Sequence, residues 1–304
     1  MTEMIKKLSP DRVRLGVTPT LWWNDDFPSM DIGIPFEQCV SEMALAGFQG
    51  CSVGHKYPTD PATLRRALDL RGLQVSEPWV STYFTINGME QQTVDAFEDQ
   101  LAFIKAMGGT DLVVAELGRS SHVLPVALFA NRPVFDDHDW DLLCTGLNRL
   151  GKIAAAAGMR LCYHHHLGTG VMTRADVDRL MASTDPELVH LLLDTGHLAC
   201  AGDDPFAAAQ AHAQRIKHVH LKDVRPEALS RVREQRLSFQ QGIEAGLFTV
   251  PGDGSIDFVP ILETLGAADY AGWLVVEAEQ DPAKADPLEY ALKARGYLRD
   301  VLGW

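Results

Sequence analysis

The sequence of 304 residues contains no apolar run that reaches the ~18 consecutive residues of a membrane-spanning helix. Its first residues, MTEMIKKLSPDR, lack the apolar centre of a secretory signal. Cysteine is scarce: the five cysteines are scattered and form no CxxC pair, which favours reduced thiols over disulfides or a zinc cluster. These absences predict a cytoplasmic protein that does not enter a membrane.

Positive charge is in short supply. The chain has 27 lysines and arginines against 41 acidic residues, which gives a formal net charge of −14. A negative surface repels nucleic acids and anionic lipids. We therefore expect no nucleic-acid partner and no membrane partner, but a small neutral or metal-bridged substrate.

Glycine is absent from TPTLWWNDD (residues 18–26), which follows the first predicted strand. A doubly wound nucleotide-binding sheet would need a glycine-rich phosphate turn at that point, so this fold is disfavoured. What is present is an alternation of short β-rich runs with amphipathic runs, repeated about eight times, which is typical of parallel strands joined by crossover helices. The predicted strands are 14–18, 49–53, 74–79, 111–117, 160–166, 189–194, 216–221 and 272–277. The predicted helices are 36–46, 61–71, 93–107, 139–157, 174–183, 205–213, 258–265 and 288–302.

This pattern predicts an α/β fold, a (β/α)8 TIM barrel that spans residues 1–304 as a single domain. The stretch at about 222–256 is long and contains its own helical pattern, so we expect an insertion between the seventh strand and its helix. Insertions at the catalytic face of a barrel act as lids or build subunit contacts, and a homo-oligomer is therefore one expectation.

Active sites of TIM barrels lie at the C-terminal ends of the strands. Three adjacent histidines stand at one such end, in YHHHLGTG, where alternation puts His164 and His166 on one face and His165 on the other. If the polar faces point inward, four side chains converge from consecutive strands. They are His164, Asp194, His220 and Glu277. Two imidazoles and two carboxylates suit Mn²⁺, Co²⁺, Fe²⁺ or Zn²⁺ better than Mg²⁺ or Ca²⁺, although mutual hydrogen bonding without metal is the alternative.

The other polar strand ends supply candidates for acid–base chemistry and for substrate binding. His166 could replace His164 as a ligand or carry a proton, and His197 could support Asp194 or simply begin a helix. The candidate catalytic residues are His166, Glu116, Glu77 and Lys222. The candidate substrate-binding residues are Trp23, Asn24, Asp25, His55, Lys56, Trp79 and His197.

Several long motifs resemble one known family. They are MRLCYHHHLGTGV, LLLDTGHLACAGDDP, RIKHVHLKDVR, TVPGDGSIDF and GWLVVEAEQDPAKADPLEYALKARGYL. They are similar to the myo-inosose-2 dehydratases of inositol catabolism, which are xylose-isomerase-like barrels, and the resemblance covers nearly the whole chain. It implies loss of water from 2-keto-myo-inositol, with Mn²⁺ or Co²⁺ as cofactor. Carried over from the wider superfamily, the metal ligands are His164, Asp194, His220 and Glu277.

The sequence also departs from that family in its first third. The resemblance predicts GTEVGNKYP where the chain has GCSVGHKYP, so Ser52 stands in place of a carboxylate. Glu77, in VSEPWVSTYF, stands where the family has a small or uncharged residue. TPTLWWNDD replaces an expected APIGWTNDD. Glu77 therefore either replaces the missing carboxylate from the neighbouring strand or belongs to a pocket rebuilt for another keto-polyol or keto-sugar.

The implied reaction begins with the acidity of a C–H bond next to a ketone. Removal of that proton gives an enolate, β-elimination expels hydroxide, and a divalent ion can stabilise the negative charge. Two other function classes fit parts of the pattern. A sugar isomerase or epimerase would use the same metal without loss of water, and a non-catalytic polyol-binding protein would keep the pocket but bind metal weakly.

Overall fold

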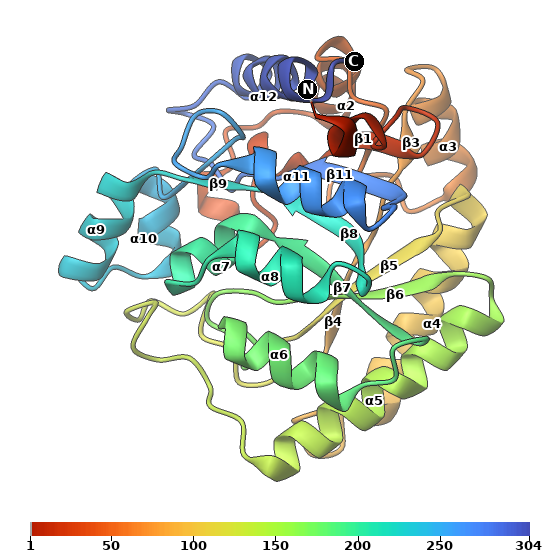
Figure 1. Cartoon of the computed structure of the whole chain (residues 1–304), viewed down its shortest axis with the longest axis vertical. Coiled ribbons are helices and arrows are strands. Elements are labelled where there is room, and N and C mark those ends of the chain that lie inside the picture. The colour runs from red at the N-terminus through yellow and green to blue at the C-terminus, as the bar shows by residue number, and fades with distance from the viewer. Residues whose placement is uncertain (1) are drawn as a thin grey trace.

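In the computed structural model, which describes residues 2–304, nine strands form one parallel sheet. Their order is β3-β2-β1-β11-β8-β7-β6-β5-β4, so that neighbours in the sequence are neighbours in the sheet (Figure 1). The strands are β1 (Val13–Val17), β2 (Gly50–Cys51), β3 (Gln74–Val75), β4 (Trp79–Thr82), β5 (Asp111–Glu116), β6 (Arg160–His164), β7 (Val189–Asp194), β8 (Ile216–Leu221) and β11 (Gly272–Val276).

The two end strands of the sheet, β3 and β4, are consecutive in the chain, so a short segment between them closes the barrel. β3 pairs with β2, β4 pairs with β5, and residues 76–78 lie between β3 and β4. The backbone N–H of Val53 donates to the carbonyl of Glu77 at 3.1 Å, which extends the pairing beyond β3. Pro78 has no N–H to donate, so the ladder changes partner at this point. The predicted strand 74–79 is therefore two short strands that together serve as the third strand of the barrel, and the TIM-barrel prediction is confirmed.

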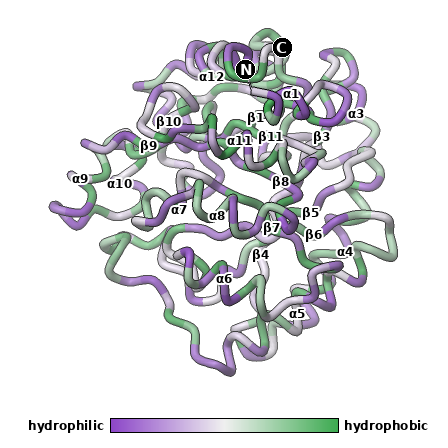
Figure 2. Tube along the Cα trace, viewed as in Figure 1, coloured by the Kyte–Doolittle hydropathy of each residue, from purple (hydrophilic) through white to green (hydrophobic). Residues whose placement is uncertain are grey.

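Helices surround the sheet, because each crossover between parallel strands passes over its outer face (Figure 1). They include α2 (Phe36–Leu45), α3 (Pro61–Asp69), α4 (Glu90–Met107), α5 (Asp137–Ala156), α6 (Arg174–Ser183), α7 (Thr195–Ala201), α8 (Pro205–His212), α11 (Phe258–Ala267) and α12 (Pro287–Leu302). Capping boxes at Asp136 and Thr173 satisfy backbone N–H groups at the start of α5 and α6. Hydrophobic and hydrophilic residues alternate along these helices, as amphipathic outer helices require (Figure 2).

A segment with its own secondary structure connects β8 to α11. It contains β9 (Asp223–Val224), α9 (Pro226–Glu234), α10 (Phe239–Glu244) and β10 (Phe248–Thr249), and β9 pairs antiparallel with β10. The Asp223 carboxylate accepts hydrogen bonds from the backbone N–H groups of Val224, Gly254 and Ile256, which ties the two ends of the segment together. This segment lies where the sequence predicts the insertion.

The interior of the molecule is mainly apolar and includes all of its thiols. All five cysteines (Cys39, Cys51, Cys144, Cys162 and Cys200) are free and buried. No helix within residues 2–304 is long and apolar enough to cross a bilayer. The chain termini lie on the same side of the molecule, where the Trp304 indole N–H donates to the carbonyl of Leu8 at 2.9 Å (Figure 1). A short helix, α1 (Glu3–Lys6), precedes this contact.

Candidate metal centre

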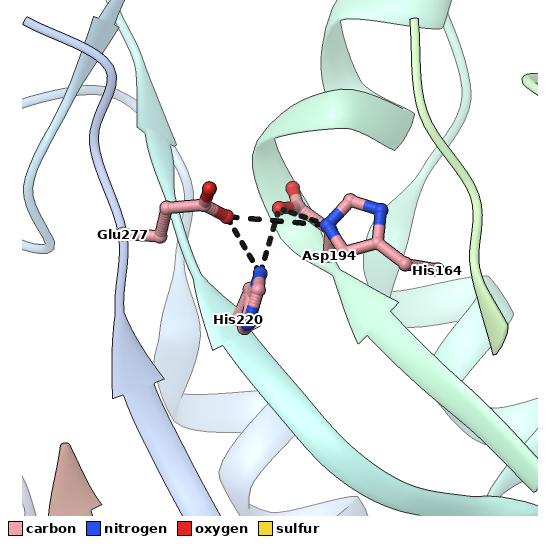
Figure 3. A group of neighbouring side chains, drawn as sticks. All are labelled: His164, Asp194, His220 and Glu277. Carbon is pink, nitrogen blue, oxygen red and sulfur yellow. Dashed lines mark ion pairs between the residues drawn. The ribbon is translucent and has the colours of Figure 1, made fainter. Parts of the chain in front are cut away.

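Four strands deliver two histidines and two carboxylates to one point at the C-terminal end of the barrel (Figure 3). His164 is the last residue of β6, and Asp194 is the last residue of β7. His220 lies on β8 in register with Asp194, and Glu277 directly follows β11. Parallel strands in register carry their terminal side chains to the same end of the sheet, so the convergence follows from the fold.

Three of the four distances between these groups match those of ligands around one ion, while the contact of His220 with Glu277 is as short as a hydrogen bond. His220 Nδ1 lies 2.6 Å from Glu277 Oε2 and 3.7 Å from Asp194 Oδ2. His164 Nε2 lies 3.6 Å from Asp194 Oδ2 and 4.0 Å from Glu277 Oε2. Ligands bound at about 2.1 Å to a common divalent ion are themselves about 3–4 Å apart. The geometry therefore accommodates a divalent metal.

The same four atoms are buried and lack hydrogen-bond partners. His164 Nε2, His220 Nδ1, Asp194 Oδ2 and Glu277 Oε2 each have no partner with acceptable hydrogen-bond geometry. A buried polar atom without a partner costs about 1–3 kcal/mol, so four at one point call for a common partner. A divalent cation satisfies all four at once, whereas mutual hydrogen bonding does not.

The carboxylates are ionised and ready to bind a cation. Burial by itself raises the pKa of Asp194, but Lys222 and the neighbouring histidines reverse the effect and hold that pKa well below its usual value. Asp194 also caps α7: its Oδ1 accepts a hydrogen bond from the backbone N–H of His197 at 2.7 Å, which leaves Oδ2 for the cation. On the opposite face of β6, His165 Nε2 accepts a hydrogen bond from the backbone N–H of Asp194 at 3.2 Å.

A second polar group lies beside the first and is built around Lys222, which is completely buried. Its Nζ lies 2.6 Å from Glu279 Oε2 and 2.9 Å from His197 Nε2. Burial alone lowers the pKa of Lys222, but the nearby Asp194, Glu277 and Glu279 raise it. Nζ is therefore a cation that fixes the carboxylate of Glu279.

His166 belongs to this second group and has a defined tautomer. Its Nδ1 lies 2.8 Å from the carbonyl oxygen of Leu167. A carbonyl only accepts, so Nδ1 carries the proton and Nε2 keeps its lone pair. Nε2 lies 3.8 Å from Glu279 Oε1. Burial lowers the pKa of His166, so the ring is neutral near pH 7 and can accept a proton at Nε2.

A pocket opens next to both groups and contains about 720 Å³ of space, part of it open to solvent. Of the candidate catalytic and substrate-binding residues, it is lined by Asn24, Asp25, Glu77, Trp79 and His166. Glu277, Glu279, His220, Asp26 and Ser52 also face it. The indole of Trp79, 40% exposed, forms one wall, with its ring centroid 5.4 Å from that of His164 and 5.9 Å from that of His166. The pocket therefore joins the candidate metal ligands to a potential base.

Other predicted residues lie outside this lining. Trp23 is buried, and Lys56 stacks over its ring while its Nζ bonds Asp31 and the carbonyl of Ile34. His55 is about half exposed and pairs with Asp25. His197 lies beneath the site, bonded to Lys222.

Glu116 is fully buried, and protein donors engage both oxygens of its carboxylate. Thr82, Phe84, Thr85 and Gly118 donate hydrogen bonds to it at 2.8–3.2 Å from hydroxyl or backbone groups. These bonds tie the chain after β4 to the chain after β5. This arrangement assigns Glu116 a structural position and leaves it no free oxygen for a substrate.

Sequence reasoning gave no role to Glu279, Asp26, His122 and Phe239. Glu279 could have been assigned, because alternation after β11 places it on the face of Glu277. His122 Nε2 lies 3.6 Å from Asp26 Oδ2, and the ring packs 5.2 Å from that of His166. Phe239, on α10, packs 5.4 Å from the ring of His166. His122 and Phe239 come from a loop and from the insertion, where no periodicity indicates direction.

Comparison with known proteins supports one assignment. The model of the xylose isomerase-like TIM barrel family matches residues 33–301. An inosose dehydratase of Geobacillus thermodenitrificans is 53% identical over 96% of this chain and 98% of its own length. An inosose dehydratase of Clostridium botulinum is 49% identical over 95% of this chain and 97% of its own length.

Solved structures show the same fold at low sequence identity. The IOLI protein with a bound zinc atom has a TM-score of 0.70 at 14% identity and covers 95% of this chain and 98% of its own. A probable 3-DHS dehydratase from Bacillus anthracis has a TM-score of 0.68 at 14% identity, covering 94% and 98%. The chain therefore belongs to the xylose isomerase-like TIM barrel family and, within it, to the family of inosose dehydratases.

Proposed function

We propose that the protein is a metal-dependent hydro-lyase that removes water from 2-keto-myo-inositol or a closely related keto-polyol. One observation carries this proposal: four buried ligand atoms without hydrogen-bond partners converge beside a pocket that also contains a neutral histidine. The inosose dehydratases at 49–53% identity support the reaction class and the substrate.

Mn²⁺ or Co²⁺ is the proposed cofactor, with Fe²⁺ and Zn²⁺ as further candidates, because the ligand set mixes imidazole nitrogen with carboxylate oxygen. His164, Asp194, His220 and Glu277 would hold it. When bound, such a cation supplies Lewis-acid stabilisation, worth several kcal/mol, for negative charge on the ketone oxygen.

His166 is the proposed base. The proton leaves the carbon next to the ketone and moves to Nε2, whose lone pair is free because Nδ1–H is bonded to the carbonyl of Leu167. The C–H electrons form the new C=C bond, and the C–O bond on the next carbon breaks. The departing hydroxyl takes the proton back from Nε2 and leaves as water, so the protein ends as it began. Acid–base help of this kind contributes about 10²–10⁴-fold.

The remaining pocket residues bind and orient the ring. Asn24 and Asp25 follow the first strand and face the pocket, where they can bond ring hydroxyls. Trp79 offers an apolar wall to the ring face. Lys222 and Glu279 form a fixed ion pair next to His166, which keeps the Glu279 oxygen available as an acceptor for a substrate hydroxyl.

The test removes one cation ligand at a time. Glu277→Gln and His220→Ala should lose both bound metal, measured by elemental analysis, and dehydration of inosose, measured by the ultraviolet absorbance of the enolised diketone. Glu263→Gln, a carboxylate change on α11 away from the site, is the control and should keep both. Wild-type dehydration that survives exhaustive chelation would overturn the metal mechanism. Exchange of a substrate proton without loss of water would instead indicate the isomerase or epimerase alternative.

The small polyol ligand agrees with the pocket, and we propose a cytoplasmic protein that can associate through the 222–256 insertion. Size-exclusion chromatography of the whole chain and of a variant with a shortened α9 would test that association.

A further inference from the structure

A line of charged side chains crosses the inside of the barrel beneath the candidate metal centre. Arg160, at the base of β6, donates two hydrogen bonds to Asp111, at 2.6 and 2.9 Å. Asp111 Oδ2 lies 3.4 Å from His218 Nδ1, and His218 Nε2 lies 3.3 Å from Glu77 Oε2. Glu77 Oε1 lies 3.4 Å from His220 Nε2. The line therefore ends at a proposed metal ligand.

Its inner members are removed from solvent. Asp111 and His218 are 0% exposed and Glu77 is 2% exposed. Burying a charge costs several kcal/mol unless a partner compensates for it, and replacing such a set by apolar residues is often neutral or stabilising. The interior of this barrel also holds the apolar cluster of Val113, Cys162 and Leu192, so charge is not needed to fill it. The buried charges therefore call for a reason beyond packing.

One such reason is that the two ring nitrogens of His220 face different groups. Nδ1 faces Glu277 and Asp194, in the position of a ligand to the common ion. A neutral imidazole that binds a cation through one nitrogen carries its proton on the other. Glu77 is the carboxylate that faces this other nitrogen, so Nε2–H has an acceptor only while Glu77 stays in place.

Backbone and side-chain contacts both hold Glu77. Its carbonyl accepts a hydrogen bond from Val53 N–H, and the proline that follows it fixes the point at which the chain changes partner strand. Its second oxygen faces His218, whose other ring nitrogen faces Asp111, and Arg160 holds Asp111 through two hydrogen bonds. Each member thus limits the movement of the next, from the base of the barrel to its catalytic end.

We propose that Glu77 is a positioning residue that fixes the ring of His220, so that Nδ1 binds the metal, and that His218, Asp111 and Arg160 hold Glu77 in place. This inference rests on the proposed metal centre. It gives Glu77 a role through His220 instead of direct acid–base contact with the substrate.

The test measures metal affinity without any substrate. Calorimetric titration with Co²⁺ should give a dissociation constant about 10–100-fold higher for Glu77→Ala than for wild type, the usual effect of removing a partner of a ligating histidine. Glu77→Gln keeps a neutral acceptor and should recover most of the loss. If the alanine variant does not fold, the Co²⁺ absorption spectrum of Glu77→Gln answers the question, because an amide oxygen accepts the His220 Nε2–H bond more weakly than a carboxylate and should alter that spectrum. Glu116→Gln changes another buried carboxylate at a strand end and should bind Co²⁺ as wild type does.

A spectroscopic readout separates positioning from general destabilisation. In the Zn²⁺-loaded protein, ¹⁵N NMR should show His220 protonated at Nε2, with faster proton exchange in Glu77→Ala and an altered Co²⁺ absorption spectrum. Equal Co²⁺ affinity and equal spectra in wild type and Glu77→Ala would overturn the inference while leaving the proposed function intact. Wild-type protein that binds Co²⁺ but does not dehydrate inososes would overturn the proposed function alone.

Discussion

The protonation states of single residues at this site depend strongly on burial and on neighbouring charges. Glu77 shows this clearly: burial raises its pKa, yet His218 and His220 lower it to about 2. The His165 ring, by contrast, is buried among other histidines, and its pKa is lowered to about 3. Two buried groups of opposite type are thus fixed in opposite charge states, one ionised and one neutral, over the range in which enzymes work.

One residue outside the site should make stability depend on pH. His190, on β7, is partly buried near Lys217, Arg160 and Arg215, and burial together with these cations lowers its pKa from 6.5 to about 4. The unfolded chain therefore binds this proton first as pH falls. Stability contributed by the neutral ring is present above pH 6.5 and is lost as pH falls toward 4.

Urea denaturation at pH 7 and pH 5 measures this loss. Wild type should lose on the order of 1–2 kcal/mol of unfolding free energy from His190 over that interval, since solvent at the partly exposed ring screens part of the effect. His190→Gln has no proton to bind and should lose correspondingly less. An identical pH dependence in the two proteins would contradict the assignment.

At the residue scale, the sequence predicts the site residues that lie at strand ends but not those that lie on loops. The four candidate metal ligands can be grouped from the sequence alone. Strand alternation predicts which side chains point into the barrel, and the TIM-barrel rule predicts that the active site lies at the C-terminal ends of the strands. The same reasoning cannot reveal which nitrogen of His220 faces Asp194 and Glu277, because ring rotation has no sequence signature. His122 and Phe239 lie on irregular or inserted segments, so their approach to His166 depends on tertiary contacts alone.

The helix α7 packs closely against Lys222, the residue that follows β8. A methyl group added to Gly196, in α7, would lie 2.5 Å from Cγ and 2.8 Å from Cδ of Lys222. These atoms are in the middle of a buried side chain that is held at its end by Glu279, so they have little room to move. The helix can therefore approach the strand only because this position has no side chain.

Gly196→Ala should displace Lys222 and lower dehydration at least tenfold, while Asp194, His164 and the bound metal remain. Turnover and metal content, measured on the same preparation, check this. Gly296→Ala is the matched control, because nothing lies within 4 Å of its added methyl group on α12. The control should keep wild-type turnover and gain up to about 1 kcal/mol of stability from the helix propensity of alanine. Full activity in Gly196→Ala would show that Lys222 is not confined in this way.

At the element scale, the order of strands and helices is readable from the sequence, but the break in the third strand is not. The run 74–79 has a continuous β pattern, and the effect of Pro78 depends on which neighbour each half pairs with. That choice arises only when the barrel closes. The insertion could be located by its length, whereas the antiparallel pair of β9 and β10 could not, since each strand has only two residues.

For the whole molecule, metal binding and stability should be linked. The unfolded chain cannot hold four ligands from four strands at one point, so a cation that binds the folded state stabilises it. At a free Co²⁺ concentration of about 100 times the dissociation constant, the gain is about 2.7 kcal/mol. Differential scanning calorimetry should show a melting temperature several degrees higher with Co²⁺ than with chelator, and one transition if residues 1–304 form one domain.

His220→Ala provides the control for this linkage. Its melting temperature should respond little to Co²⁺, because one of the four candidate ligands is removed. A rise equal to that of wild type would mean that the cation binds elsewhere, for example to the many surface carboxylates of a chain with a net charge of −14.

The burial of every thiol gives the molecule a built-in chemical reporter. The five sulfur atoms lie in α2, β2, α5, β6 and α7, so they sample much of the length of the chain. A thiol-specific reagent reacts with each one only when its surroundings open. The rate at which each cysteine is labelled, followed by peptide mass spectrometry, would therefore rank the parts of the barrel by how readily they open, with no probe introduced into the protein.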